Sequence, residues 1–313
     1  MVRLDGAVVL PVSGRQAGYA PAGLNALRRC LWVAVWLGAQ AAHALTGGAG
    51  PSETPPVSDW AAVGSLEVAG QLFSATLIGR QHVLTAAHVV NGANPALVRF
   101  RAAGGGGFSS AATSVHVHPA FTGNTTNNTP GDPSVHADLA IVKLSQVAPA
   151  SLPVARVFMG PVLGRVLSLV SHGGSTTLIT TGENRADVVF SDFLGRPATY
   201  LFDFDGPDLS SNRLGPPVAA NGTLGAAREA TLANGDSGSA AFVQFDGRWY
   251  LAGVNTFSLG FSAPTGDSRP GGSGGGGVVL SEHMGWLREV LAAPAPVAGA
   301  AAQGPAAGQI KKP

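Results

Sequence analysis

The chain has 313 residues and a formal net charge of +1 at pH 7, and only 12% of its residues are charged. This balance gives no electrostatic support for a nucleic-acid partner or for binding to an anionic membrane surface. Hydrophobic residues make up 45% of the chain, which also contains 44 glycines and 22 prolines. Such a composition favours many short strands joined by turns over a helical bundle.

The first 44 residues have the pattern of a secretory leader. Arg28-Arg29 precede an apolar run over Cys30–Ala42, and Ala42-His43-Ala44 supplies small residues for cleavage. About thirteen apolar residues are too few to span a bilayer comfortably, which disfavours a membrane anchor. We expect cleavage after Ala44 and a secreted or periplasmic product without stable membrane association. The region before the run is long, so either translation starts downstream of Met1 or the leader is an extended one.

Short apolar runs of strand length recur along the rest of the chain, in two sets of about six. The first set is Ala61–Val68, Phe73–Ile78, His82–Thr85, Ala96–Arg101, Ser114–His118 and Leu139–Leu144. The second set is Val162–Ser171, Thr176–Thr181, Ala186–Phe190, Thr199–Phe204, Ser239–Phe245, Trp249–Thr256 and Gly277–Leu280. This pattern predicts an all-β fold.

One helix is expected near the end of the chain. Ser281 can cap it and Pro294 blocks its continuation. The apolar residues that recur between them at helical spacing are Met284, Leu287, Val290 and Leu291. Residues 294–313 are rich in Ala, Pro and Gly and poor in large apolar side chains, so we expect a disordered tail there.

Three short motifs contain the residue types of nucleophilic catalysis. His88 ends the run Val83-Leu84-Thr85-Ala86-Ala87, where an imidazole can act as a general base. Asp138 heads an apolar run in which a carboxylate could be buried beside an imidazole. Ser237 lies in Gly235-Asp236-Ser237-Gly238, and a serine becomes nucleophilic when a base takes its proton. Each motif taken alone has a simpler explanation: His88 could be a core histidine, Asp138 a turn residue and Ser237 part of a polar turn. These explanations account less well for the occurrence of all three motifs in the order His, Asp, Ser.

In Thr85-Ala86-Ala87-His88, Asp138-Leu139-Ala140 and Gly235-Asp236-Ser237-Gly238, the chain resembles the trypsin-like serine proteases of the chymotrypsin fold. The similarity runs from about Leu45 to Leu291. It implies two antiparallel six-stranded Greek-key β-barrels and a C-terminal helix. The expected organisation is a leader over 1–44, barrels over 45–152 and 153–293, and a tail over 294–313.

The resemblance also implies a role for each motif residue. Ser237 attacks the scissile carbonyl, His88 takes and returns its proton, and Asp138 orients the imidazole. The backbone N–H groups of Gly235 and Ser237 form the oxyanion hole. The implied substrate is a polypeptide, and no metal or organic cofactor is needed. We expect the mature protein to be a monomer.

In activated members of this family a new N-terminal ammonium pairs with the aspartate before the nucleophile, which here is Asp236. Cleavage after Ala44 exposes Leu45-Thr46-Gly47-Gly48, which is similar to the start of those proteins. We hypothesise that leader removal alone creates the activating terminus at Leu45, because burying Asp236 without a cation is costly. The simpler interpretation is that Asp236 caps N–H groups of its own turn.

The family's charge-determining position lies six residues before the nucleophile, at Thr231, which Leu232 follows. The pocket wall is implied to come from Thr256-Phe257-Ser258. None of these residues is charged, so we expect a neutral, apolar residue on the acyl side of the cleaved bond (P1). The glycine-rich segment Gly260–Gly276 is implied to border this pocket and is predicted to be mobile.

Two other functions stay open: a binding protein that has the fold without activity, and an esterase that uses the same three residues. The first is kept open by Ser239, where many family members have glycine, and by the missing disulfides. Cys30, in the leader, is the only cysteine, and Phe73 and Val89 stand where the family often pairs two cysteines. Export without disulfides favours a bacterial origin.

Overall fold

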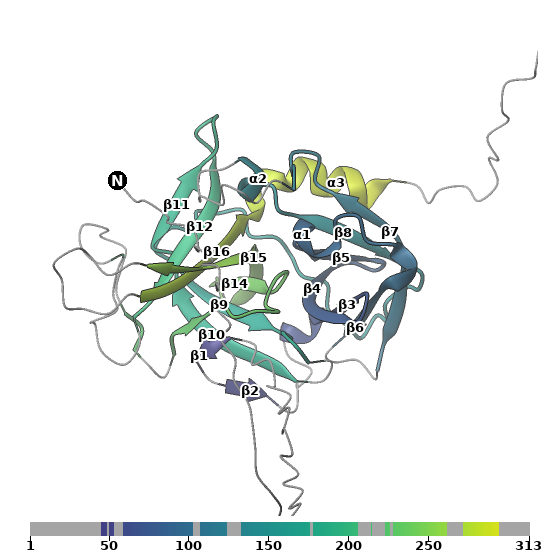
Figure 1. Cartoon of the computed structure of the whole chain (residues 1–313), viewed down its shortest axis with the longest axis horizontal. Coiled ribbons are helices and arrows are strands. Elements are labelled where there is room, and N and C mark those ends of the chain that lie inside the picture. Colours follow the sequence, from purple (N-terminus) through teal and green to yellow (C-terminus); the bar gives the residue numbers. More distant parts are fainter. Residues whose placement is uncertain are drawn as a thin grey trace, which may run out of the picture. The chain divides into compact units, whose positions relative to one another are not determined.

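The computed structural model describes residues 45–293 apart from 49, 53–58, 103–106, 124–132, 176–177, 206–213, 215–222, 226–227 and 262–271 (Figure 1). The expected leader over 1–44 and the expected tail over 294–313 lie outside the described residues. By its contacts the chain divides into Met1–Gln40 and Ala41–Pro313, and every described residue belongs to the second unit. In the described part, no helix is both long and apolar enough to cross a membrane.

Six strands of the first half close into an antiparallel barrel, which confirms the barrel expected there (Figure 1). They are β3 (Val63–Val68), β4 (Gln71–Gly79), β5 (His82–Thr85), β6 (Val98–Ala102), β7 (Ser109–Val117) and β8 (Ala140–Leu144). Their order is β3-β4-β5-β8-β7-β6, and Phe100 of β6 pairs with Leu66 of β3 to close the ring. Side chains alternate along a strand, so Leu66, Leu77, Phe100 and Ile141 point inward and are buried.

The second half forms an eight-stranded antiparallel sheet in the order β11-β12-β16-β15-β14-β9-β10-β2. These strands are β2 (Gly50–Ser52), β9 (Val166–Ser171), β10 (Ile179–Arg185), β11 (Val188–Ser191), β12 (Pro197–Phe204), β14 (Ala240–Phe245), β15 (Arg248–Phe261) and β16 (Gly272–Val279). This half has eight strands instead of the six expected for the second barrel, and one of them, β2 from the start of the described chain, adds to the edge at β10. Separately, the short strand β1 (Thr46–Gly47) pairs with β13 (Ala230–Thr231).

Strand β16 contains part of the segment predicted to be a mobile loop. Residues 273–276 pair with both β12 and β15, so the loop prediction is wrong for them, and 262–271 lie outside the described residues. The strand glycines leave room for large side chains from elsewhere. In order, Gly275, Gly276 and Gly277 face Leu232, Phe257 and Tyr200. Glycine in this strand therefore serves close packing.

The described chain ends in the 3-10 turn η4 (Leu280–His283) and the helix α3 (Met284–Ala292), whose Leu287 packs into the barrel core. The expected helix is present, but the expected cap is wrong. Because η4 comes first, His283 is at the N-cap position, and the Ser281 hydroxyl instead donates to Glu282. The other short helical turns are η1 (Asp59–Ala62), α1 (Ala87–Val90), η2 (Pro95–Leu97) and α2 (Pro133–His136).

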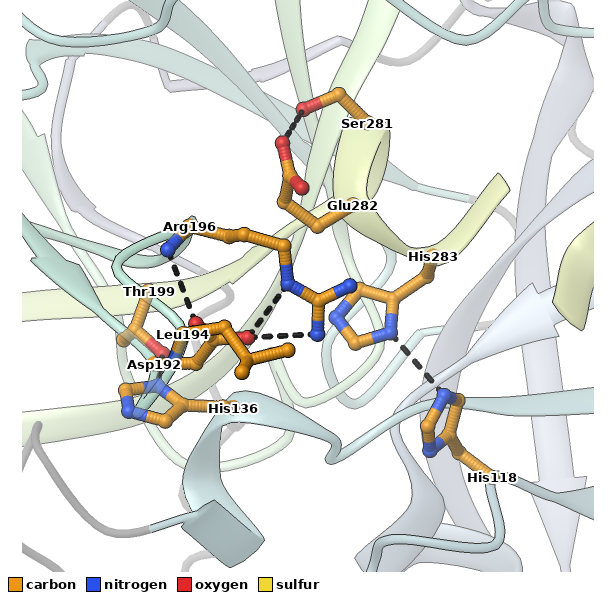
Figure 2. Close-up of polar contacts among 9 residues, drawn as sticks. All are labelled: His118, His136, Asp192, Leu194, Arg196, Thr199, Ser281, Glu282 and His283. Carbon is orange, nitrogen blue, oxygen red and sulfur yellow. Dashed lines mark hydrogen bonds and ion pairs between the residues drawn. The ribbon is translucent and has the colours of Figure 1, made fainter. Parts of the chain in front are cut away.

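A pair of histidines joins this C-terminal segment to the end of β7 (Figure 2). Nε2 of His118 lies 3.1 Å from Nδ1 of His283. The N–H of Ala120 donates to Nδ1 of His118, so Nε2 of His118 carries the proton and donates to His283. Burial, helped by the neighbouring His118, lowers the pKa of His283 to about 4. The pair is therefore neutral at pH 7.

Candidate active site

His88 lies just after β5, in the one-turn helix α1. Its neighbours Ala86, Ala87 and Val89 are buried in the barrel core. The small alanines let this turn pack closely against the barrel, while 32% of the His88 side chain stays exposed. The local sequence thus directs apolar side chains inward and leaves the imidazole accessible.

Asp138 lies between α2 and β8 and is 8% exposed. Its Oδ1 accepts the backbone N–H of His88 at 2.8 Å, and its Oδ2 lies 2.7 Å from Nδ1 of the same residue. An ionised carboxylate can only accept hydrogen bonds, so Nδ1 carries the proton and Nε2 presents its lone pair. That nitrogen lies 2.8 Å from Oγ of Ser237. The structure therefore brings the three predicted side chains together in one chain of hydrogen-bonding contacts.

Ser237 lies in a tight turn with a glycine on either side. Gly235 and Gly238 have φ angles of +96° and +82°, a region in which a side chain would be strained. The N–H of Ser74 donates to the Ser237 carbonyl oxygen at 3.2 Å. A Cβ on Gly238 would collide with the Ser74 carbonyl and with Thr85. The turn is thus seated directly on strands β4 and β5 of the barrel that carries His88.

Asp236 lies in a buried polar network and is 1% exposed. Its Oδ1 accepts from the hydroxyl of Ser171 at 2.6 Å. Its Oδ2 accepts from the N–H groups of Ala233 at 2.7 Å and of Leu45 at 3.0 Å. Burial raises the pKa of Asp236, and these three hydrogen bonds oppose that shift. The two residues expected to pair, Leu45 and Asp236, are therefore in contact through the Leu45 backbone nitrogen.

A cleft of about 660 Å³ opens beside Ser237. The residues predicted for the pocket that line it are Leu232, Thr256, Phe257 and Ser258. Thr231 is not among the described residues that line it. It is buried in β13, where it pairs with Thr46 of β1. Thr231 is therefore a buried strand residue, while the adjacent Leu232 lines the cleft.

Sequence reasoning missed one wall of the cleft. Gln71, Leu72 and Phe73, at the start of β4, line it, together with Gly174 and Asn255. None of these residues has the chemistry that marks a catalytic group. They border the site because barrel closure brings the beginning of β4 next to the turn that carries Ser237, and no local sequence pattern reports this.

In the described part of the chain, no three His, Cys, Asp or Glu side chains are placed to hold a metal ion. The reactive groups that the site brings together are a hydroxyl, an imidazole and a carboxylate. This set is suited to proton transfer combined with nucleophilic attack.

A comparison with protein-family models matches residues 51–183 to the family described as Trypsin. The matched span contains His88, Asp138 and the whole closed barrel, and it ends before Ser237. A search among curated proteins found no match. The family match and the barrel architecture agree with the resemblance seen in the three motifs. Residues 51–183 match the trypsin family, and this match together with the barrel architecture supports a trypsin-like serine protease with the chymotrypsin fold.

Proposed function

We propose that this protein is a secreted or periplasmic serine endopeptidase that works through an acyl-enzyme on Ser237. The observation that supports this most strongly is the relay from Asp138 through His88 to Ser237, with successive distances of 2.7 and 2.8 Å. A binding protein that had lost activity would not need all three groups in hydrogen-bonding positions, so the geometry favours catalysis.

In the proposed mechanism, Oγ of Ser237 attacks the peptide carbonyl carbon while Nε2 of His88 takes its proton. The C–N bond breaks as His88 gives that proton to the leaving nitrogen, and water then attacks the acyl-enzyme by the same route. Asp138 holds the imidazole and stabilises its charged form. The N–H groups of Gly235 and Ser237 receive the oxyanion, and each such donor is typically worth about 10²–10³ in rate.

Leu45 and Asp236 provide the proposed activation step. Cleavage after Ala44 converts the Leu45 amide, 3.0 Å from Asp236, into an ammonium group at the same position. A charge-assisted hydrogen bond would then compensate the burial of the carboxylate. The pairing of β1 with β13 holds this terminus in place. Leader removal would therefore yield the active enzyme directly.

The cleft supports a preference for a neutral, apolar P1 residue. Leu72, Leu232 and Phe257 contribute apolar walls. Among the described residues that line the cleft, Asp236 alone is charged, and it is already bonded to Ser171, Ala233 and Leu45. No free charge is then available there to select an Arg, Lys, Asp or Glu side chain. Cleavage of a peptide library mainly after Arg would contradict this preference.

Labelling with a fluorophosphonate, followed by peptide mass mapping, tests the proposed nucleophile. We expect one adduct, on Ser237, in protein that starts at Leu45. The Ser237→Ala and His88→Ala variants should remain unlabelled. A parent protein that stays unlabelled although it is folded would support the binding-protein alternative.

Matched ester and amide substrates then separate a peptidase from an esterase. We expect turnover of both, with kcat/KM for peptides in the range of ordinary enzymes. Turnover of esters with no peptide cleavage would favour the esterase. Size-exclusion chromatography of the same sample should show the proposed monomer.

A further inference from the structure

Three buried polar side chains beside the cleft are joined end to end. Tyr200 of β12, Asn255 of β15 and Ser239, just before β14, are each 0% exposed. The Tyr200 hydroxyl donates to Oδ1 of Asn255 at 2.6 Å. Nδ2 of Asn255 bonds to Oγ of Ser239 at 2.8 Å. At this depth an unpaired polar group is costly, so the three residues depend on one another.

The orientation of the Asn255 amide is set by its surroundings. Nδ2 lies 3.4 Å from the carbonyl oxygen of Ala240, and a carbonyl oxygen can only accept a hydrogen bond. A flipped amide would place two oxygens against each other, so Oδ1 must face Tyr200. Burial also raises the pKa of Tyr200, which keeps its hydroxyl protonated and able to donate.

Asn255 is also bonded to the turn that carries the nucleophile. Its carbonyl oxygen accepts the N–H of Gly238 at 2.9 Å, and its N–H donates to the carbonyl oxygen of Ser239 at 2.9 Å. With the contact to Ala240, Asn255 touches three successive residues that follow Ser237. A displacement of Asn255 would therefore move the turn itself.

Tyr200 occupies a space that glycines create. A Cβ on Gly253 would meet its ring, and a Cβ on Gly277 would meet its hydroxyl. These two glycines lie on the paired strands β15 and β16. The neighbouring backbone thus leaves room for a phenol whose hydroxyl reaches Asn255.

We propose that Asn255 is a positioning residue that fixes Ser237 relative to His88, with Tyr200 and Ser239 holding its amide. This explains why Ser239 stands where many family members have glycine, since its hydroxyl is the partner of the amide. The hydrogen-bonded bridge formed by Tyr200, Asn255 and Ser239 joins β12 and β15 to the nucleophile turn. It does so in a chain whose only cysteine, Cys30, lies in the expected leader. The inference rests on the proposed role of Ser237 as the nucleophile.

The variants Asn255→Leu, Ser239→Ala and Tyr200→Phe each remove one member of the bridge at little change in size. The readout is the second-order rate constant for fluorophosphonate labelling of Ser237 per folded molecule, together with kcat and KM for a peptide. We expect labelling to slow about tenfold in Asn255→Leu and about threefold in the other two, because small misplacements of a reacting group are costly. KM should change by less than about twofold.

Tyr250→Phe is the matched control. Tyr250 is half-buried on the same strand as Asn255, and its hydroxyl makes no hydrogen bond within the described residues. Its labelling rate should equal that of the parent. If Asn255→Leu does not fold, Tyr200→Phe, which keeps the aromatic ring, decides the question.

Thermal unfolding separates positioning from stability. A lower Tm with an unchanged labelling rate per folded molecule would overturn the proposal, and so would a KM that rises in step with the loss of kcat/KM. If the parent is labelled at Ser237 and all three variants match it, only the positioning role fails. If the folded parent is not labelled at Ser237, the proposed function fails and this inference with it.

Discussion

The backbone nitrogen of Leu45 lies 3.0 Å from Oδ2 of Asp236, although 191 positions separate the two residues in the sequence. Leu45 is 4% exposed and Asp236 is 1% exposed, so water does not replace this contact. Asp236 directly precedes Ser237. The start of the described chain and the geometry of the nucleophile are therefore linked through one carboxylate.

A protein that begins at Leu45 should be more active than one that keeps Ala44. The shorter form places an ammonium group beside Asp236, whereas the longer form leaves a neutral amide there, so the buried carboxylate lacks a cation. We expect kcat/KM to be at least about tenfold lower with the extra residue. Both forms can be released from a fusion partner by a protease that leaves no added residues.

N-terminal sequencing of the secreted protein should read Leu-Thr-Gly-Gly. A fully active enzyme that begins well away from Leu45 would rule out activation by leader removal. Equal activity of the two released forms would argue that Asp236 is satisfied by Ser171 and Ala233 alone.

Asp138→Asn should reduce kcat by about 10⁴ with a small effect on KM. The amide no longer compels the proton to sit on Nδ1 of His88, so Nε2 loses its role as a base. Steady-state kinetics with an apolar P1 peptide measures the effect. Asp192→Asn is a suitable control, because the side chain of Asp192 bonds to Leu194 and Arg196 and to no member of the relay, so this variant should leave kcat unchanged.

Gly238→Ala should destabilise the protein far more than Gly195→Ala. Both glycines have positive φ, +82° and +76°, so both substitutions introduce strain of about 1 kcal/mol or more. A Cβ on Gly238 would also collide with Ser74 and Thr85, whereas one on Gly195 meets nothing within 4 Å. We expect a difference of at least about 2 kcal/mol in urea unfolding, with activity lost in Gly238→Ala alone. Equal stabilities would contradict the packing around Gly238.

Asp187→Asn should make the protein more stable at alkaline pH. Asp187 is 1% exposed, and burial, with neighbouring Asp203 and Asp205, raises its pKa from 3.8 to about 8. The folded state therefore keeps a proton that the unfolded state loses above pH 4. The contribution of Asp187 to stability therefore falls as pH rises from about 4 to about 8.

Asparagine carries no proton to lose, so the variant should gain in Tm over the parent across that window, by about 4 °C or more at pH 8. Thermal scans between pH 4 and pH 9 give the comparison. Parallel curves for the two proteins would show that Asp187 is ionised in the folded state at neutral pH.

His283→Gln should reduce the loss of thermal stability that the protein shows when the pH is lowered from 7 to 4.5. The pKa of His283 is lowered to about 4, so between pH 4 and 6.5 the unfolded state binds the proton more readily than the folded state. The contribution of His283 to parent stability should therefore fall as pH drops through this range. Glutamine can still accept from His118 but does not titrate. Melting curves at pH 7 and pH 4.5 test this, and an undiminished loss on acidification would contradict it.

The sequence predicted the strands of the closed barrel well, and it singled out the three motif residues that the fold brings within hydrogen-bonding distance, because both depend on local pattern. Alternating apolar residues mark a strand wherever it pairs. The errors came from segments in which contacts with distant parts of the chain, or an adjoining turn, decide the structure instead of the local residue types. Gly275 and its neighbours suggested a loop, yet they pair within β16, where large side chains occupy the space that a Cβ would need. Ser281 suggested a helix cap, yet a 3-10 turn shifts the helix start to His283.

Local sequence patterns were enough to identify the groups available for chemistry: a serine in a turn that contains two glycines, a histidine after small residues and an aspartate before a buried strand. Long-range packing, in contrast, places Gln71–Phe73 along a wall of the cleft, keeps Thr231 out of the described residues that line it, and joins Asn255 to the nucleophile turn by hydrogen bonds. Those outcomes depend on which strands become neighbours and in what register. Register is set by closing the barrel over its buried side chains, a long-range condition that no short stretch of sequence contains.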